Sequence, residues 1–337
     1  MRYGNRATEM RYGNRATEMS TTLAAGLLAA VVGICLVSST HHAFAGCNTD
    51  GVARTMVEEI APGIFVRPGV HETMSGENNG GIANIGFVLG TNAVAVIDTG
   101  GSACDGQRLR AAVRSRTDLP IRFVINTHVH PDHVFGNAAF KQDNPRFIGH
   151  GQLPRAIAAR GPHYLTANRT IMGADALAGT EIIAPNLTVD DRMELDLGGR
   201  TLELTAHNVG HTDNDLTVFD VKTGTLWTGD LVFQGHLPVV DGSLKGWLTV
   251  MDELSRIPAN RAIPGHGPVS IPWPAGLRPQ RQYLTVLIQD LRRLIAEGRT
   301  MNHAIEIAAR SERSAWKMFD EFNPRNASAG FAELEWE

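Results

Sequence analysis

Short apolar segments rich in isoleucine and valine recur along the chain, and each of them ends in residues that favour turns. This pattern is typical of strands, which we predict in the first half at 58–68, with a Pro-Gly turn, and at 82–90, 92–100 and 121–128. The segment 102–117 instead has helical spacing, with Leu109, Ala112 and Val113 on one face. The first half therefore predicts the order strand, strand, strand, helix, strand.

The second half repeats this theme. We predict strands at 201–208, 216–222, 224–230 and 261–267. We predict helices at 244–257 and 279–297. Residues 151–200 mix a helical segment with loops and have the least legible pattern of the chain. Two similar halves, each a sheet with covering helices, suggest sheets packed face to face with helices outside. No linker rich in proline and serine occurs between residues 50 and 337, so we predict one domain over 46–337.

Residues 1–45 have a different character. The sequence MRYGNRATE occurs twice in tandem at 1–18, and this repeat is too short to be a structural unit. An apolar run at 23–38 follows, with arginines before it and Ala43-Phe44-Ala45 after it. These features are typical of a secretory signal peptide. We therefore expect cleavage after Ala45 and a periplasmic or secreted protein, with an uncleaved membrane anchor or lipid attachment at Cys47 as alternatives.

Composition excludes some partners and some ligands. The chain has 337 residues, a net charge of −4 and few, scattered aromatic residues, so we expect no nucleic acid partner. Cys35 would leave with the signal peptide, and Cys47 and Cys104 would remain. Because the first residues of a domain are usually loose, we expect no disulfide between these two. Neither lies near another candidate ligand, so we expect no thiolate metal site.

Side chains that can bind metals gather at the ends of predicted strands, in four separate places. The sequence THVHPDHV follows the strand at 121–128, and NVGHTDND, LWTGDLVF and IPGHGP lie at later strands. Glycine in the later groups lets the backbone turn sharply while a side chain points at a shared centre. The candidate metal ligands are His128, His130, Asp132, His133, His211, Asp230 and His266.

The spacing in the first of these groups favours two metal ions over one. Residues i and i+2 at a strand end point in the same direction, so His128 and His130 can hold one ion together. Pro131 then turns the chain, which directs the next two residues elsewhere. The resulting assignment is His128, His130 and His211 for one ion, Asp132, His133 and His266 for the other, and Asp230 as a bridge.

This ligand set predicts hydrolytic chemistry. Imidazole and carboxylate ligands without thiolate suit Zn²⁺ well, and also Fe or Mn. Two ions about 3.5–4 Å apart typically share a bridging hydroxide, because bound water then ionises at a pH of roughly 7. We therefore expect a hydrolase with two Zn²⁺ ions, in which Asp132 and Asp230 are the catalytic carboxylates.

The motifs THVHPDH, GHTDND, TGD and PGHG, in this order, resemble the metal motifs of the metallo-β-lactamase superfamily. The resemblance covers about residues 58–300. It implies an α/β fold, the four-layer αββα sandwich, with a dinuclear site at one sheet edge and with the ligands assigned above. It also implies that Asp98, in AVIDTG, does not bind the metal itself but supports the residues that do.

Longer sequence segments resemble one particular group within this superfamily. APGIFVRPGVHE, NNGGIANIGFVLG, INTHVHPDHVFGNAAF and HLPVVDGSLKGWL are similar to periplasmic metallohydrolases associated with quinoprotein dehydrogenase systems, relatives of the sulfur-oxidation metallohydrolases. This implies a periplasmic dehydrogenase system as a partner. Asp230 stands where secreted β-lactamases generally have Cys or Ser, and it resembles the thioesterase, lactonase and phosphodiesterase branches. The secretion signal differs from the glyoxalase-type thioesterases, which are mostly intracellular.

A few further residues are candidates for a supporting or substrate-binding role. His236 lies in the loop after Asp230 and is a candidate to line the substrate pocket, and Asp241 and Trp247 are weaker candidates for the same role. His207 precedes His211 in a strand and is expected to be structural.

The leading hypothesis is a periplasmic dinuclear zinc hydrolase that cleaves an ester, thioester, lactone or related bond of a small molecule. The first alternative is a secreted metallo-β-lactamase that hydrolyses β-lactams. The second is a mononuclear iron sulfur-dioxygenase, which uses a similar ligand set. The third is a non-catalytic carrier of a metal or a quinone cofactor.

Overall fold

The computed structural model of the chain describes residue 47 and residues 56–337. The signal peptide, its cleavage site and the tandem repeat lie outside the described residues and remain predictions. Within the described part of the chain, no helix is both long enough and apolar enough to cross a membrane.

The first sheet has seven strands, which lie side by side in chain order. Neighbours are antiparallel from β1 to β4 and parallel from β4 to β7. The central strand β4 is buried on both faces, as its continuous apolar sequence VAVI requires. The strands are β1 (Glu58–Ala61), β2 (Ile64–Arg67), β3 (Ile85–Leu89), β4 (Val94–Ile97), β5 (Ile121–Ile125), β6 (Arg146–His150) and β7 (Leu187–Val189).

The second sheet has six strands in the order β13-β12-β11-β10-β9-β8. Its neighbours are antiparallel except for β11 and β12, which are parallel because the helix α4 connects them. The strands are β8 (Arg192–Asp196), β9 (Thr201–Ala206), β10 (Leu216–Asp220), β11 (Thr225–Phe233), β12 (Arg261–His266) and β13 (Ile271–Pro272).

The two sheets pack face to face. One hydrophobic cluster contains side chains of both, among them Ile64, Val88 and Ile97 from the first sheet and Leu204 and Trp227 from the second. Burial of these apolar side chains, each about 1.5–3 kcal/mol, is the main force that holds the sheets together. The inner face of each strand is therefore fixed, and with it the direction in which the strand ends point.

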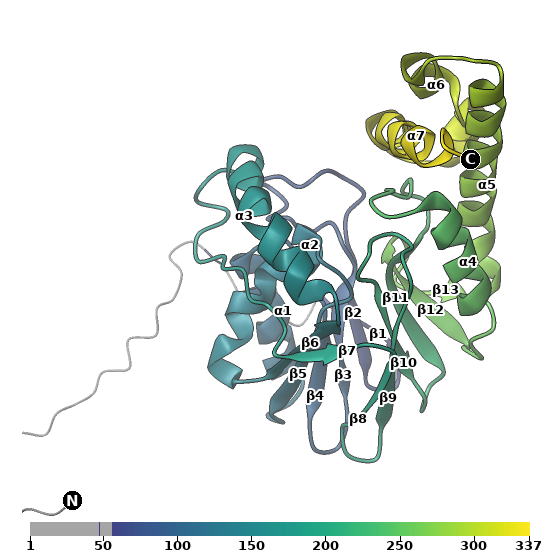
Figure 1. The fold of residues 1–337 in the computed structure, drawn as a ribbon. Helices are drawn as coiled ribbons and strands as arrows, with labels where there is room; N and C mark the ends of the chain where they lie inside the picture. The colour runs from purple at the N-terminus through teal and green to yellow at the C-terminus, as the bar shows by residue number, and fades with distance from the viewer. Residues whose placement is uncertain (1–46, 48–55) are drawn as a thin grey trace, which may run out of the picture. The chain divides into compact units, whose positions relative to one another are not determined.

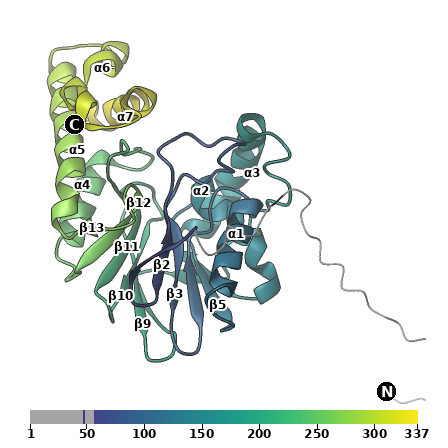
Figure 2. The same ribbon diagram turned by 180° about the vertical axis from the view of Figure 1, so that it is seen from behind.

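Helices cover the outer faces (Figures 1 and 2). On the first sheet, α1 (Ala103–Arg114) buries Leu109 and Ala112 against strand residues such as Phe87. On the second sheet, α4 (Leu244–Leu254) and α5 (Arg278–Ala296) share one cluster with β11. The observed layers are helix, sheet, sheet and helix, which confirms the predicted αββα sandwich.

Further helices lie near the strand ends and at the C-terminus. Two of them, α2 and α3, follow β5 and β6 of the first sheet, and α7 packs on α5 and α6. The remaining elements are α2 (Pro131–Val134), α3 (Leu153–Met172), α6 (Met301–Ile307), α7 (Phe319–Leu334) and the 3₁₀ helices η1 (Phe135–Asp143), η2 (Ala275–Leu277) and η3 (Arg310–Ala315).

The predicted elements agree with these bounds except in two regions. The segment 58–68, predicted as one strand with a Pro-Gly turn, is a hairpin of two strands, because Gly63 adopts a φ of +73° and reverses the chain after Pro62. The helical segment expected within 151–200 is α3, which continues through Pro162, and the strands β7 and β8 of the same region were not predicted.

Cys47 and Cys104 form a disulfide, so the prediction of two unpaired cysteines is wrong. Their Cα atoms lie 5.4 Å apart, and Cys104 is the second residue of α1. The prediction assumed a loose N-terminal segment, but a covalent bond to a helix holds residue 47 in place. The bond also occupies the Cys47 sulfur that lipid attachment would require.

Replacing Cys104 by serine is expected to lower the free energy of unfolding by about 2–4 kcal/mol, because the disulfide constrains the unfolded chain. The check is denaturant unfolding of the wild type and of Cys104→Ser, each with and without a reductant. The reductant should destabilise the wild type and leave the variant unchanged. Equal unfolding midpoints of oxidised wild type and variant would refute the stabilising role.

Candidate metal centre

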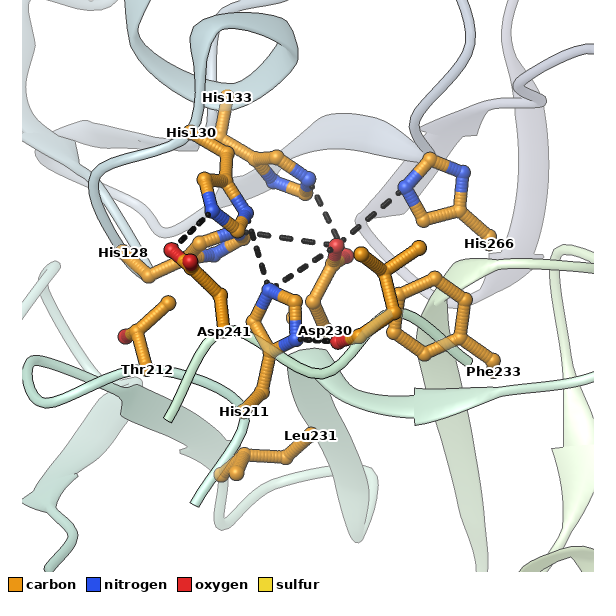
Figure 3. A network of polar contacts seen from close by, with 12 residues as sticks. His128, His130, His133, His211, Thr212, Asp230, Leu231, Phe233, Asp241 and His266 are labelled. Atoms are coloured by element: carbon orange, nitrogen blue, oxygen red, sulfur yellow. Dashed lines mark hydrogen bonds and ion pairs between the residues drawn. The ribbon is translucent and has the colours of Figure 1, made fainter. Parts of the chain in front are cut away.

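The polar strand ends that the sequence singles out meet at one edge of the two sheets. From the first sheet, β5 leads into the loop that carries His128, and α2 begins directly after His130. From the second sheet, β11 carries Asp230, β12 ends at His266, and His211 lies in the loop between β9 and β10. Figure 3 shows these side chains gathered around the Asp230 carboxylate.

Three imidazole nitrogens face one another in a first group. His130 Nδ1 lies 3.0 Å from His128 Nε2 and 3.0 Å from His211 Nε2. Asp230 Oδ2 completes the group, at 3.7 Å from His128 Nε2 and 3.5 Å from His211 Nε2. One ligand atom from each of the four residues lies within 4.8 Å of all the others, a spacing at which one ion can contact them all.

The protons of two of these imidazoles point away from the group. His211 Nδ1 lies 2.7 Å from the carbonyl oxygen of Val239, which only accepts, so this nitrogen carries the proton. His130 Nε2 donates in the same way to Asp241 Oδ2, at 3.0 Å. With that outer proton as the only one on the ring, the nitrogen that faces the group is the one with a lone pair.

The same holds for His128. The Thr127 hydroxyl donates to Asp98 Oδ2 at 2.8 Å, so it accepts from His128 Nδ1 at 3.1 Å. Burial lowers the pKa of His128 well below its usual value and the pKa of His211 to about 3, so both rings are neutral. Three lone pairs that point at one another repel unless a cation lies between them. This donor set therefore fits a metal ion.

Asp132, His133 and His266 form a second group, whose ligand atoms also lie within 4.8 Å of one another. Asp132 Oδ2 lies 3.5 Å from His133 Nε2 and 3.3 Å from His266 Nε2. Burial and the neighbouring carboxylates act in opposite directions on His133, and the carboxylates of Asp230, Asp132 and Asp98 prevail and raise its pKa well above the usual value. The surroundings of this group are thus strongly negative and attract a cation.

Two facing atoms of this region are buried without a hydrogen bond. They are His133 Nε2 and Asp230 Oδ1, which lie 3.1 Å apart in a geometry that is not a hydrogen bond. An unsatisfied buried polar atom is costly, and a pair of them needs a common partner. A cation that contacts both atoms satisfies them together, so this second group fits a metal ion as well.

Asp230 is placed between the two groups. Its Oδ2 faces His128 and His211 and also lies 3.4 Å from His266 Nε2, whereas its Oδ1 faces His133. The residue beside it in β12 is Gly265, and a Cβ atom there would overlap Asp230 Oδ1. The close approach of the two parallel strands therefore requires glycine at this position, which leaves room for the carboxylate.

Asp98 lies behind the ligands, where the resemblance placed it. Its carboxylate accepts from the Thr127 backbone and hydroxyl and from His133 Nδ1, each at 2.8 Å. This arrangement fixes His133 Nε2 toward the centre, and it orients His128 through Thr127. Asp98 itself has a φ of +54°, a conformation that aspartate tolerates better than most residues.

The structure gives the remaining candidates different positions. His236 is buried, and its ring stacks on His266 with centroids 5.0 Å apart, so it lies behind a ligand. Trp247 is fully buried and donates from Nε1 to the Leu231 carbonyl at 3.0 Å, which makes it a core residue. Asp241 orients His130 through the hydrogen bond described above.

Sequence analysis missed two arginines and gave no role to Asp215. Arg160 of α3 and Arg325 of α7 both bind the Asp241 carboxylate. Asp215 accepts from the Thr212 backbone and hydroxyl and so shapes the loop of His211. The motif GHTDND contains Asp215 and could have indicated that role, whereas nothing local connects the arginines with a site.

The predicted structural role of His207 agrees with its surroundings. Its ring is buried, and Nε2 lies 2.9 Å from the Thr217 hydroxyl. Burial lowers the pKa of His207 to about 4, so the ring is neutral. It borders a cavity of about 1100 Å³, which lies along β8, β9 and β10 and contains none of the seven candidate ligands.

Replacing His128 or His130 by alanine is expected to reduce the bound metal from about two ions to about one per chain, because each change removes a ligand of the first group only. The measurement is metal content after dialysis, with circular dichroism as the check on folding. His163→Ala, an exposed histidine of α3, is the matched control and should bind as much metal as the wild type. Unchanged metal content in both ligand variants would show that the assignment is wrong.

Comparison with known proteins agrees with this arrangement. A model of the metallo-beta-lactamase superfamily matches residues 78–266. Among curated proteins, the beta-lactamase-like protein 2 homolog of Caenorhabditis elegans is 26% identical over 185 residues. That alignment covers 54% of this chain and 55% of the relative, so the chain spans about half of the relative's length.

Solved structures share the fold at low sequence identity. A metallo-beta-lactamase from Pontibacter korlensis has a TM-score of 0.56 and 20% identity, and the match covers 68% of this chain and 98% of that one. The inverting sec-alkylsulfatase Pisa1 from Pseudomonas sp. has a TM-score of 0.61 and 16% identity, with coverages of 84% and 51%. Since the superfamily match takes in more than half of the chain and all seven candidate ligands, we conclude that the chain belongs to the metallo-β-lactamase superfamily.

Proposed function

We propose that this protein is a dinuclear zinc hydrolase that cleaves an ester, thioester, lactone or related bond of a small molecule. The observation that carries the proposal is the position of Asp230, whose carboxylate faces both ligand groups: Oδ2 lies near His128 and His266, and Oδ1 lies near His133. One group offers three imidazole lone pairs, and the other offers two imidazoles and the carboxylate of Asp132. A carboxylate shared in this way is suited to bridge two cations.

Zinc is the ion that the ligands favour. All candidate ligand atoms are nitrogen or oxygen, and the two cysteines of the described chain are joined in a disulfide, so no thiolate is available. Zn²⁺ accepts such nitrogen and oxygen ligands readily. Fe and Mn accept them too, and metal analysis distinguishes the three.

When bound, the metal ions would polarise a substrate oxygen and supply a nucleophile from water near neutral pH. The residues of the chain hold this centre in a fixed geometry. Asp98 orients His133, and the Phe233 ring stacks on His266 with centroids 4.9 Å apart and an angle of 9° between the planes. Because these supporting side chains are packed and hydrogen-bonded, the ligands need little rearrangement during a reaction.

The rival functions differ from this one in ways that can be measured. A β-lactamase would hydrolyse β-lactams, but Asp230 stands where secreted β-lactamases generally have Cys or Ser. A sulfur-dioxygenase would contain one iron ion per chain. A carrier of a metal or a quinone cofactor would bind its cargo and turn over no substrate.

We also propose that the protein works in the periplasm or outside the cell, in the context of a quinoprotein dehydrogenase system. The Cys47–Cys104 disulfide supports an oxidising compartment. N-terminal sequencing of the exported protein should begin at Gly46. A protein that retains residues before Leu23 would point to an anchor instead.

Metal content and a substrate panel test the function together. We expect about two zinc ions per chain and turnover of at least one member of a panel of esters, thioesters, lactones and β-lactams. One iron ion with oxygen consumption would establish the dioxygenase instead. Full metal loading with no turnover would favour the carrier, and turnover of β-lactams alone would favour the lactamase.

Replacing Asp230 by asparagine is expected to weaken the second metal ion and to lower kcat/KM by several orders of magnitude, because the shared negative charge is lost. The side-chain size is kept, so the protein should remain folded. Asp252→Asn, an exposed aspartate of α4, is the matched control and should behave as the wild type. If Asp230→Ser keeps a β-lactam turnover that the wild type also has, Asp230 is not a bridge and the lactamase assignment replaces ours.

A further inference from the structure

Two arginines from distant parts of the chain meet beside the candidate metal centre. Arg160 lies on α3, and Arg325 lies on α7, beyond the region 78–266 that the superfamily model matches. Arg160 Nη1 lies 2.5 Å from Asp241 Oδ2, and Arg325 Nη2 lies 3.1 Å from Asp241 Oδ1. The oxygen that Arg160 contacts also accepts from His130, so the pair lies next to a metal ligand.

Holding the fold together does not require these ion pairs. The side chains of Arg160 and Arg325 are 32% and 54% exposed, and exposed ion pairs contribute only about 0–1 kcal/mol. Buried contacts secure α7 to the loop of Asp241 instead, since Asn326 Nδ2 donates to the Pro238 carbonyl at 2.6 Å and Asn326 Oδ1 accepts from Val240 at 2.9 Å.

The charges of this cluster do not cancel. Two guanidinium groups share the one carboxylate of Asp241. Asp213 is the other nearby acid, but its side chain is exposed and forms no ion pair with Arg160 within 4.0 Å among the described residues. Each guanidinium has five N–H donors in a planar fork, and one hydrogen bond to Asp241 leaves donors free. Such a fork matches the paired oxygens of a carboxylate or a sulfate.

A neighbour of Arg160 on α3 also lies close to a candidate metal ligand. One helical turn further along α3 lies Tyr164, whose ring is 6.2 Å from the His130 ring between centroids. Arg160 through Asp241 and Tyr164 through its ring are therefore both connected to His130, so this side of α3 faces a metal ligand. The arginines thus lie one carboxylate away from His130, a candidate metal ligand.

We propose that Arg160 and Arg325 bind an oxyanion group, a carboxylate or a sulfate, on the substrate whose other end is cleaved at the metal centre. This inference rests on the proposed hydrolase function and narrows its substrate class to anionic molecules. The two arginines are specificity-determining residues, and the helix α7 contributes one of them to the active site.

The first test compares two matched esters with the zinc-loaded protein. Mono-4-nitrophenyl adipate carries a free carboxylate, and 4-nitrophenyl 6-oxoheptanoate is its neutral counterpart of equal length. We expect the ratio of their kcat/KM values to fall roughly 10-fold or more in Arg160→Gln and in Arg325→Gln, because a charge-assisted hydrogen bond is lost. Arg313→Gln, an exposed arginine paired with Asp320, is the matched control and should keep the wild-type ratio.

An equal loss for both esters would overturn the proposal, because the arginines would then only support Asp241. A second measurement is independent of turnover: calorimetric titration of inorganic sulfate into the zinc-loaded protein. We expect the affinity to fall roughly 10-fold or more in the double variant, with metal content unchanged. Equal sulfate affinity in wild type and double variant would also overturn the proposal, whereas lost affinity in a protein without esterase activity would contradict the hydrolase function and leave the anion site standing.

Discussion

Two carboxylates and five imidazoles are buried in one small space, and the structure depends on satisfying the lone pairs of the first group and the unpaired atoms of the second. Within the first group, His128, His130 and His211 turn unprotonated nitrogens toward one another at hydrogen-bond distance. In the second, His133 Nε2 and Asp230 Oδ1 have no hydrogen-bond partner. Cations resolve both problems at once, so the same feature that would destabilise a metal-free protein makes it a metal-binding one.

The ligands keep these orientations because the surrounding chain holds the other side of each ring. Asp98, the Val239 carbonyl and Asp241 each accept a hydrogen bond that fixes which nitrogen faces inward. The parallel strands β11 and β12 approach closely enough that glycine is needed beside Asp230. From further along the chain, α7 secures the loop of Asp241, so the helices after β12 take part in shaping the centre.

Sequence predicts this site well where the signal is local or periodic. The two-residue spacing groups His128 with His130, although both lie in the loop after β5 and not in a strand, and the turn at Pro131 separates the following pair from them, which is the grouping of ligand atoms in the structure. Contacts between distant segments carry no such signal. The disulfide of Cys47 and the arginines that meet at Asp241 each depend on tertiary packing between distant segments.

Anomalous diffraction at the zinc edge, from crystals of the zinc-loaded protein, tests the central claim most directly. We predict two peaks on either side of Asp230, one bonded to Nε2 of His128, Nδ1 of His130 and Nε2 of His211. The other should be bonded to Asp132, His133 and His266. A single peak at full loading, or a zinc ion bonded to His130 through Nε2, would contradict the arrangement of lone pairs from which the function is inferred.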